Sequence, residues 1–149
     1  MPSILVIYNP IAGRGRVKKH WPEVQQGLVD AGIEFDVNAT SAPLEAVTLA
    51  EKAATKYSTV IAVGGDGTVH EVVNGLLRAS REGETITLGV VPLGNGDDFA
   101  KMIPPQTTIG GKVFAFDTHT ESVAALWVDV EFARDFHFGG CLGEHGAVV

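Results

Sequence analysis

The chain has 149 residues, which is enough for one domain and the start of a second. Its composition, 45% hydrophobic and 19% charged, is typical of a globular protein that buries a core. The net charge of -7 argues against nucleic acid as the main partner, and the single cysteine, Cys141, excludes an internal disulfide and a four-cysteine zinc site. No segment approaches the ~20 apolar residues of a membrane span, and the N-terminus lacks the basic region of a signal peptide, so we expect a soluble, cytoplasmic protein.

The first predicted element is a buried strand at residues 4–8, followed by a loop at 9–16 that contains two glycines. A helix is expected next, with Pro22 near its first turn. Its inward face is predicted to carry Trp21, Val24, Leu28 and Val29. A short strand at 35–38 and a second helix that opens near Pro43 follow.

A buried strand at 59–63 then leads into a turn in which three glycines surround Asp66. Glycine permits positive φ angles and lets the backbone approach a ligand closely. Thr68 and Glu71 stand three residues apart ahead of an apolar helical pattern, which predicts a capping box at the start of a third helix. Unpaired N–H groups and the positive end of the helix dipole would face the space above the sheet, so the sequence predicts an anion site here.

Asp66 has two interpretations at this point. A carboxylate beside an anion is repulsive unless a metal ion lies between them, or unless the carboxylate accepts a hydroxyl proton. Alternatively, the segment is only a tight turn in which Asp66 caps backbone N–H groups. The residue types alone leave both interpretations open.

A fourth strand is expected at 87–91 and leads into a loop at 92–98. Four strands alternating with three helices are typical of a doubly wound α/β domain. Right-handed crossovers bring the carboxyl ends of parallel strands to one edge of the sheet. The loops at 9–16, 64–68 and 92–98 all follow strands, so we expect them to converge there on a ligand.

From residue 104 onward the helical pattern disappears, and short strands are predicted at 112–117, 124–130 and 134–138. We interpret these strands as the beginning of a β-rich second domain, which divides the chain into domains at 1–103 and 104–149. The chain ends on an apolar segment that would leave an open edge strand, so we expect it to be truncated.

Other candidate residues have a structural alternative of similar weight. Arg14 begins a basic cluster beside a strand end and is our candidate for a phosphate contact, although the cluster could be a solvated face. His70 could be a solvated or capping side chain, and Asp98 could cap a short helix. The lysine of the Gly110-Gly111-Lys112 segment is followed by Val113, so the Walker A loop is absent.

Taken together, these segments resemble the catalytic domain of the diacylglycerol kinase and sphingosine kinase family, lipid kinases related in fold to NAD kinase and phosphofructokinase. The resemblance is strongest at residues 64–75, which look like the family's nucleotide-binding signature. Residues 9–13 match its first phosphate loop, and Thr40 falls where the family has an ATP-contacting threonine. Residues 92–101 look like its Gly-Thr-x-Asn-Asp-Phe-Ala-Arg segment, with Asn95 in place of the threonine.

The resemblance implies a three-layer α/β/α nucleotide-binding domain, followed by a lipid-binding β domain that opens near Val128–Val130. It implies ATP and Mg²⁺ as cofactors. The implied ATP-binding residues are Asn9, Pro10, Ile11, Ala12, Gly13, Arg14, Thr40, Gly64, Gly65, Gly67, Thr68, Val69, His70, Glu71 and Asn95. The implied Mg²⁺ ligands are Asp66, Asp98 and Asp129, and Asp66 is also the implied catalytic residue, because one branch of the family uses the matching aspartate as the base.

The predicted function is therefore transfer of the γ-phosphate of ATP to a lipid hydroxyl, with diacylglycerol as the leading substrate class. Two alternatives stay open: a kinase of a soluble acceptor such as NAD, and a regulatory protein that binds nucleotide without turnover. The expected partners are ATP and a lipid, and nucleic acid is not expected. Peripheral contact with the inner membrane face and a homodimer are both left open.

Overall fold

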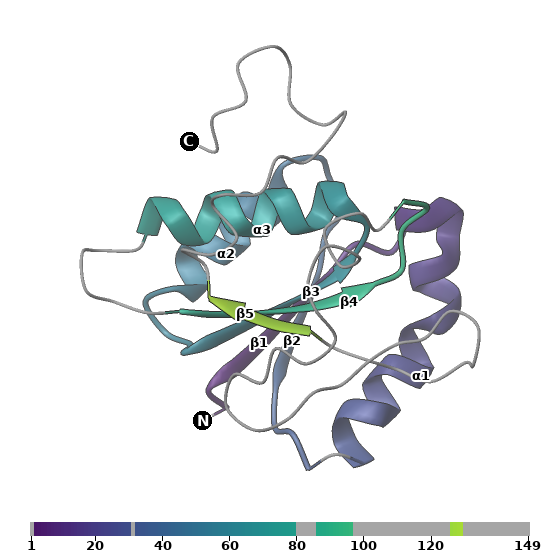
Figure 1. Ribbon diagram of the computed structural model, residues 1–149, viewed down its shortest axis with the longest axis horizontal. Helices are drawn as coiled ribbons and strands as arrows, with labels where there is room; N and C mark the ends of the chain where they lie inside the picture. Colours follow the sequence, from purple (N-terminus) through teal and green to yellow (C-terminus); the bar gives the residue numbers. More distant parts are fainter. Residues whose placement is uncertain (1, 31, 80–85, 97–125, 130–149) are drawn as a thin grey trace.

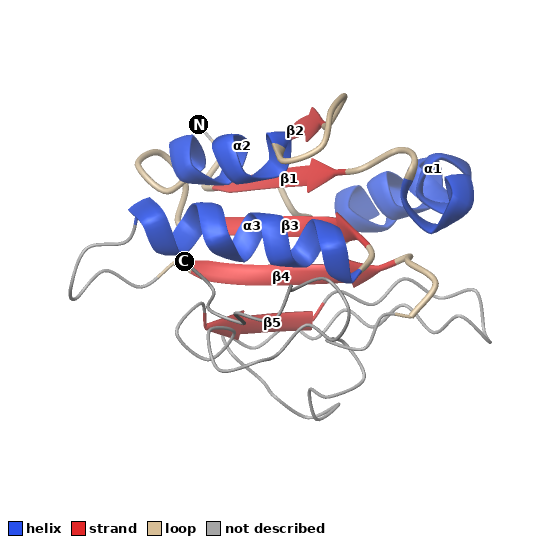
Figure 2. Cartoon of the chain, turned by 90° about the horizontal axis from the view of Figure 1, so that it is seen from above, coloured by secondary structure: helices blue, strands red, loops and turns tan. Residues whose placement is uncertain are grey.

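The computed structural model describes residues 2–30, 32–79, 86–96 and 126–129. Five strands form one sheet in the order β2-β1-β3-β4-β5 (Figure 2). The strands are β1 (Ile4–Tyr8), β2 (Asp36–Ala39), β3 (Thr59–Gly64), β4 (Thr87–Pro92) and β5 (Leu126–Asp129). The first four run parallel, and β5 lies antiparallel to β4.

Helices cover both faces of this sheet (Figures 1 and 2). The helical segments are the 3-10 turn η1 (Ala12–Gly15), α1 (Arg16–Asp30), α2 (Glu45–Ala53) and α3 (Asp66–Ala79). Helices α2 and α3 pack on one face, and α1 packs on the other. The described residues therefore form a three-layer α/β/α arrangement, as the sequence predicts.

The central strand β3 shows why the apolar run becomes a strand buried on both faces. Val60 and Ala62 pack with α2 and α3, whereas Ile61 and Val63 pack with α1. Successive side chains point to opposite faces of a sheet, so only an uninterrupted apolar run satisfies both layers.

The predicted strands agree with the observed ones to within about one residue, and the expected parallel pairing of β1 with β3 is confirmed. The strand expected at 124–130 is observed as β5 and joins the same sheet beside β4. The strands predicted at 112–117 and 134–138 lie outside the described residues. The division of the chain at residue 103 stays a prediction.

The expected course of the first helix was wrong. Helix α1 begins at Arg16, directly after η1, so Pro22 lies inside the helix and not in its first turn. Val29, expected on the inward face, is 55% exposed, while Val17 is fully buried. The earlier start brings Val17 into the apolar stripe with Val24 and Leu28. Val29 is turned away from this stripe because each residue advances ~100° around the helix axis.

The capping box predicted from Thr68 and Glu71 was also wrong. Helix α3 begins at Asp66, so Thr68 lies within the first turn and does not precede it. Its side chain is 5% exposed and sits against Gly64, where an added Cβ would overlap the Thr68 hydroxyl oxygen. Thr68 thus packs the start of α3 onto the end of β3.

Candidate functional site

The three loops that follow β1, β3 and β4 meet at one edge of the sheet, as the sequence predicts. Asn9 donates its backbone N–H to Val63 O at 3.1 Å, and Leu93 donates its N–H to Gly64 O at 2.9 Å. On the other side, the Thr40 N–H donates to Tyr8 O at 2.9 Å. These bonds continue the parallel ladder past the strand ends and hold four segments distant in sequence side by side.

Two glycines pack these loops against one another. Gly13 has a φ of +62°, and a Cβ there would overlap the carbonyl oxygen of Leu93. A Cβ on Gly65 would lie 3.0 Å from Gly94 Cα. Both positions therefore need glycine for contact between loops, before any ligand is considered.

Gly67 differs from its neighbours in the turn. A Cβ at this position meets no atom within 4 Å, and the residue is exposed in the first turn of α3. The packing of the described residues thus leaves open space above Gly67, beside the N–H groups that begin the helix. Such N–H groups and the positive end of the helix dipole favour an anion.

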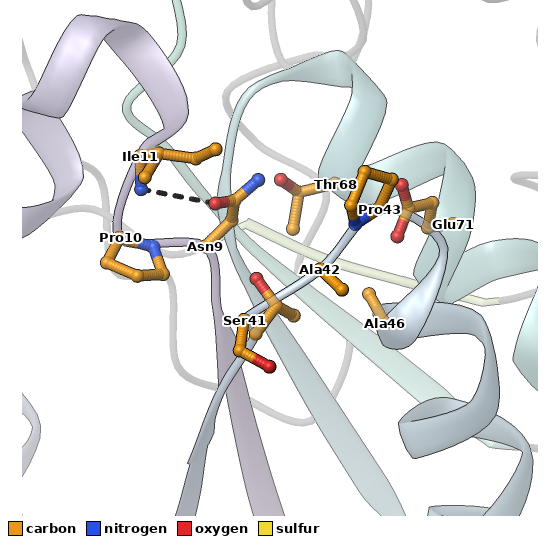
Figure 3. Close-up of a pocket in the computed structure, with 10 residues that line it drawn as sticks. Asn9, Pro10, Ile11, Ser41, Ala42, Pro43, Ala46, Thr68 and Glu71 are labelled. Carbon is orange, nitrogen blue, oxygen red and sulfur yellow. Dashed lines mark hydrogen bonds between the residues drawn. The ribbon is translucent and has the colours of Figure 1, made fainter.

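A pocket of about 470 Å³ opens at this edge (Figure 3). It lies between the loop after β1, the segment that joins β2 to α2, and the first turns of α3. Its lining residues are Asn9, Pro10, Ile11, Thr40, Ser41, Ala42, Pro43, Ala46, Thr68 and Glu71. In Figure 3 the Asn9 side chain points toward Thr68, and Asn9 Oδ1 accepts the Ile11 N–H at 3.2 Å.

Six of the residues predicted to bind ATP line this pocket: Asn9, Pro10, Ile11, Thr40, Thr68 and Glu71. Sequence reasoning missed Ser41, Ala42, Pro43 and Ala46, which form the wall opposite the loop after β1. The available signal was their position in the segment that follows Thr40. The other nine do not line it: Ala12, Gly13 and Arg14 lie in η1, Gly64 and Gly65 support the turn, Gly67 and His70 lie in α3, Val69 belongs to the core, and Asn95 is exposed.

The two arginines of the loop after β1 differ in their surroundings, and the phosphate contact expected of Arg14 stays a prediction. Arg14 is exposed and has a φ of 57°. Arg16 is partly buried and donates from Nη1 to Gly94 O at 2.9 Å, which joins the loop after β1 to the loop after β4. Arg14 and Arg16 are separated by a single glycine, so the sequence alone does not show which of them bonds to the loop after β4.

His70 lies near the start of α3 and does not line the pocket. Burial lowers its pKa from the ordinary value, and nearby Glu71 opposes this in part. The buried Asn74 donates from Nδ2 to the His70 carbonyl oxygen at 2.9 Å and lies 3.0 Å from His70 Nε2. A neutral ring that accepts at Nε2 fits this arrangement, and the Asn74 side chain then holds the ring in one orientation.

Of the three carboxylates predicted to bind metal, Asp66 and Asp129 lie at opposite ends of the sheet's strands. Asp66 is the first residue of α3, at the carboxyl end of β3. Asp129 pairs with Thr87 at the amino end of β4, whereas Pro92 at the other end pairs with Gly64. At ~3.3 Å per residue, the backbone of Asp129 lies about 16 Å along the sheet from that edge. Asp98 lies outside the described residues, and within the described ranges no three His, Cys, Asp or Glu side chains form a cluster suited to a metal.

Comparison with known proteins agrees with this geometry. Residues 3–126 match the diacylglycerol kinase catalytic domain. The chain belongs to that family. Over 104 residues it is 42% identical to a diacylglycerol kinase of Bacillus subtilis strain 168, which covers 69% of this chain and 33% of the relative. It is 36% identical over 120 residues to a diacylglycerol kinase of Staphylococcus haemolyticus strain JCSC1435, covering 79% of this chain and 36% of the relative.

The same similarity holds for a solved structure. A diacylglycerol kinase from Bacillus anthracis superposes with a TM-score of 0.58 at 30% identity, over 66% of this chain and 36% of the other. This diacylglycerol kinase family chain thus spans about a third of the length of the relatives that it matches. None of its described helices has the length and hydropathy needed to cross a membrane.

Proposed function

We propose that the chain is the nucleotide-binding part of an ATP-dependent lipid kinase whose acceptor is diacylglycerol. The pocket at the carboxyl edge of the sheet carries this proposal, because it unites Asn9, Thr40 and Thr68 from three distant segments. All three offer neutral hydrogen-bonding groups that suit phosphate or ribose oxygens. The relatives named diacylglycerol kinase supply the acceptor class.

In the proposed complex, the backbone amides of residues 65–68 hold the phosphates at the start of α3. The loop at 9–13 contributes fewer donors than the sequence suggested: the N–H groups of Asn9, Ile11 and Ala12 already donate to Val63 O, Asn9 Oδ1 and Asn9 O, and Pro10 has no N–H. The open space above Gly67 lets a phosphate oxygen approach the backbone, and the helix dipole stabilises the negative charge. Because the loops are already packed through Gly13 and Gly65, little reorganisation is needed when ATP binds.

The chemical step is an in-line transfer. The acceptor oxygen forms a bond to the γ-phosphorus, the bond from that phosphorus to the β–γ bridging oxygen breaks, and ADP leaves. Asp66, the first residue of α3, either accepts the hydroxyl proton or takes part in binding Mg²⁺. Mg²⁺ carried with ATP would neutralise phosphate charge when bound, and Asp66 is the candidate ligand that the described residues offer at this edge. Asp98 and Arg14 stay predicted contributors, and the register of β5 places the backbone of Asp129 elsewhere.

The remaining predictions concern the acceptor side. We propose that the lipid is bound by the second domain expected from residue 104 onward, together with further segments of a longer protein. Peripheral contact with a membrane follows from a lipid acceptor. A homodimer stays open.

Turnover of the full-length protein tests the proposal against both alternatives. ATP consumption should require diacylglycerol in mixed micelles and should yield the phosphorylated lipid. Turnover with NAD but not with diacylglycerol would establish a kinase of a soluble acceptor. Binding of ATP without turnover in either case would favour the regulatory alternative.

A further inference from the structure

One wall of the pocket is the segment 40–43, which lies between the end of β2 and the start of α2. Thr40 is tied to β1 through its N–H, but Ser41, Ala42 and Pro43 are exposed. Burial in the core therefore does not determine the shape of this wall. Another interaction must hold it, since a short exposed segment otherwise samples many conformations.

A single carboxylate oxygen supplies that interaction. Oε2 of Glu45 accepts the Ser41 N–H at 2.6 Å, the Ser41 hydroxyl at 2.8 Å and the Ala42 N–H at 3.1 Å. The bond from the Ser41 backbone, followed by that from its hydroxyl, holds the pKa of Glu45 below its ordinary value. Glu45 itself does not line the pocket, so these contacts act only on the wall.

The backbone beside these contacts is strained. Leu44 has a φ of 63° and is 67% exposed, so packing does not explain a left-handed conformation in a residue with a branched side chain. The turn at Leu44 lets Glu45, the first residue of α2, reach back to Ser41. Strain of this kind persists where other interactions over-determine the local structure.

We propose that Glu45 is a positioning residue for the nucleotide, whose carboxylate preorganises the pocket wall at 40–43. The inference rests on the proposed binding of ATP in this pocket. Holding the wall in its bound shape before ATP arrives removes an ordering cost from binding. Loss of this contact should weaken ATP binding although Glu45 does not touch ATP.

A simpler role for Glu45 is a favourable charge at the N-terminus of α2. Two substitutions separate the roles. Glu45→Asp keeps the charge but is one methylene shorter and does not reach Ser41. Glu45→Gln keeps the length and an acceptor oxygen but loses the charge.

The test measures ATP affinity by calorimetry on the 149-residue chain, with amide hydrogen exchange at Ser41 and Ala42. We expect Glu45→Ala and Glu45→Asp to bind ATP about tenfold more weakly and to lose protection at both amides, and Glu45→Gln to stay within about threefold of the unaltered chain. Glu51→Ala is the matched control, because it removes an exposed carboxylate from the same helix without a bond to the wall. It should change neither quantity.

Three results would overturn the inference. The first is ATP affinity of Glu45→Ala within twofold of the unaltered chain, and the second is a loss shared by Glu51→Ala. The third is the reverse order, with Asp tolerated and Gln not, which would assign the effect to helix charge. If the unaltered chain does not bind ATP, the proposed function fails, while amide protection in the Glu45 variants still shows whether this carboxylate holds the wall.

Discussion

At the scale of single residues, the glycines of the turn after β3 are needed for different physical reasons. Gly64 leaves room for Thr68, and Gly65 leaves room for Gly94, so both serve packing within the protein. Among the residues that the structure describes, Gly67 has no neighbour that requires glycine. A substitution at Gly67 therefore tests a ligand without disturbing the loops, which a substitution at Gly65 cannot do.

We expect Gly67→Ala to weaken ATP binding by about tenfold or more, because the added methyl group occupies space that a phosphate would use. The melting temperature should stay equal or rise slightly, since alanine is favoured over glycine in a helix by up to ~1 kcal/mol. Gly27→Ala in α1 makes the same change in a helix that does not line the pocket. Unchanged calorimetric affinity in Gly67→Ala would show that the open space is not used.

Asp66→Asn separates the catalytic interpretation of this residue from the capping one. Asparagine keeps the size and caps a helix almost as well as aspartate, so a cap predicts near-normal turnover. A proton acceptor predicts a fall in kcat on the order of 10²-fold or more, with an unchanged melting temperature. The measurement is kcat of the full-length protein with saturating ATP and diacylglycerol in mixed micelles. A fall below about threefold would reject the catalytic role, because ~0.6 kcal/mol lies within ordinary context effects.

At the scale of elements, α2 and α3 approach closely at Gly75. A Cβ there would overlap Val47 O and would lie 2.7 Å from the Ala50 Cβ. The sequence places Gly75 within a helical pattern, where glycine is unfavourable, and only the contact between the two helices accounts for it. This contact brings the amino end of α2, with its pocket wall, alongside α3.

We expect Gly75→Ala to lower the free energy of unfolding by about 1–3 kcal/mol, because the helices must separate to admit the methyl group. This loss would exceed the gain of up to ~1 kcal/mol that alanine brings to an isolated helix. Gly67→Ala in the same helix is the control, since it meets open space. Denaturant unfolding measures both. Equal stability of the two variants would contradict the close approach.

At the scale of the whole molecule, the site is formed by segments that only the folded sheet brings together. A ligand that binds this edge stabilises the native state alone and so shifts the unfolding equilibrium. We expect ATP at 100 times its dissociation constant to add about 2.7 kcal/mol and to raise the melting temperature by several degrees. Adenosine should give a much smaller shift if the phosphates supply most of the affinity. Equal shifts with ATP and adenosine would contradict an anion site at the start of α3.

The sequence by itself determined the four parallel strands, the glycine turn, the family and the loops that meet at the pocket. Apolar runs such as 59–63 and turn residues such as Asn9 and Pro10 act through local geometry, so their meaning can be read without the fold. The convergence of the loops followed as well, because parallel strands with right-handed crossovers leave one edge for their carboxyl ends.

Only the tertiary structure decided which neighbours those local elements meet. It distinguished Arg16, bonded to Gly94, from the exposed Arg14, and it placed the backbone of Asp129 at the opposite end of β4 from the site. It also revealed the pocket wall that Glu45 holds. Each of these facts depends on strand register, on where a helix begins or on contacts across the fold. The periodicity of apolar residues along the chain does not predict them.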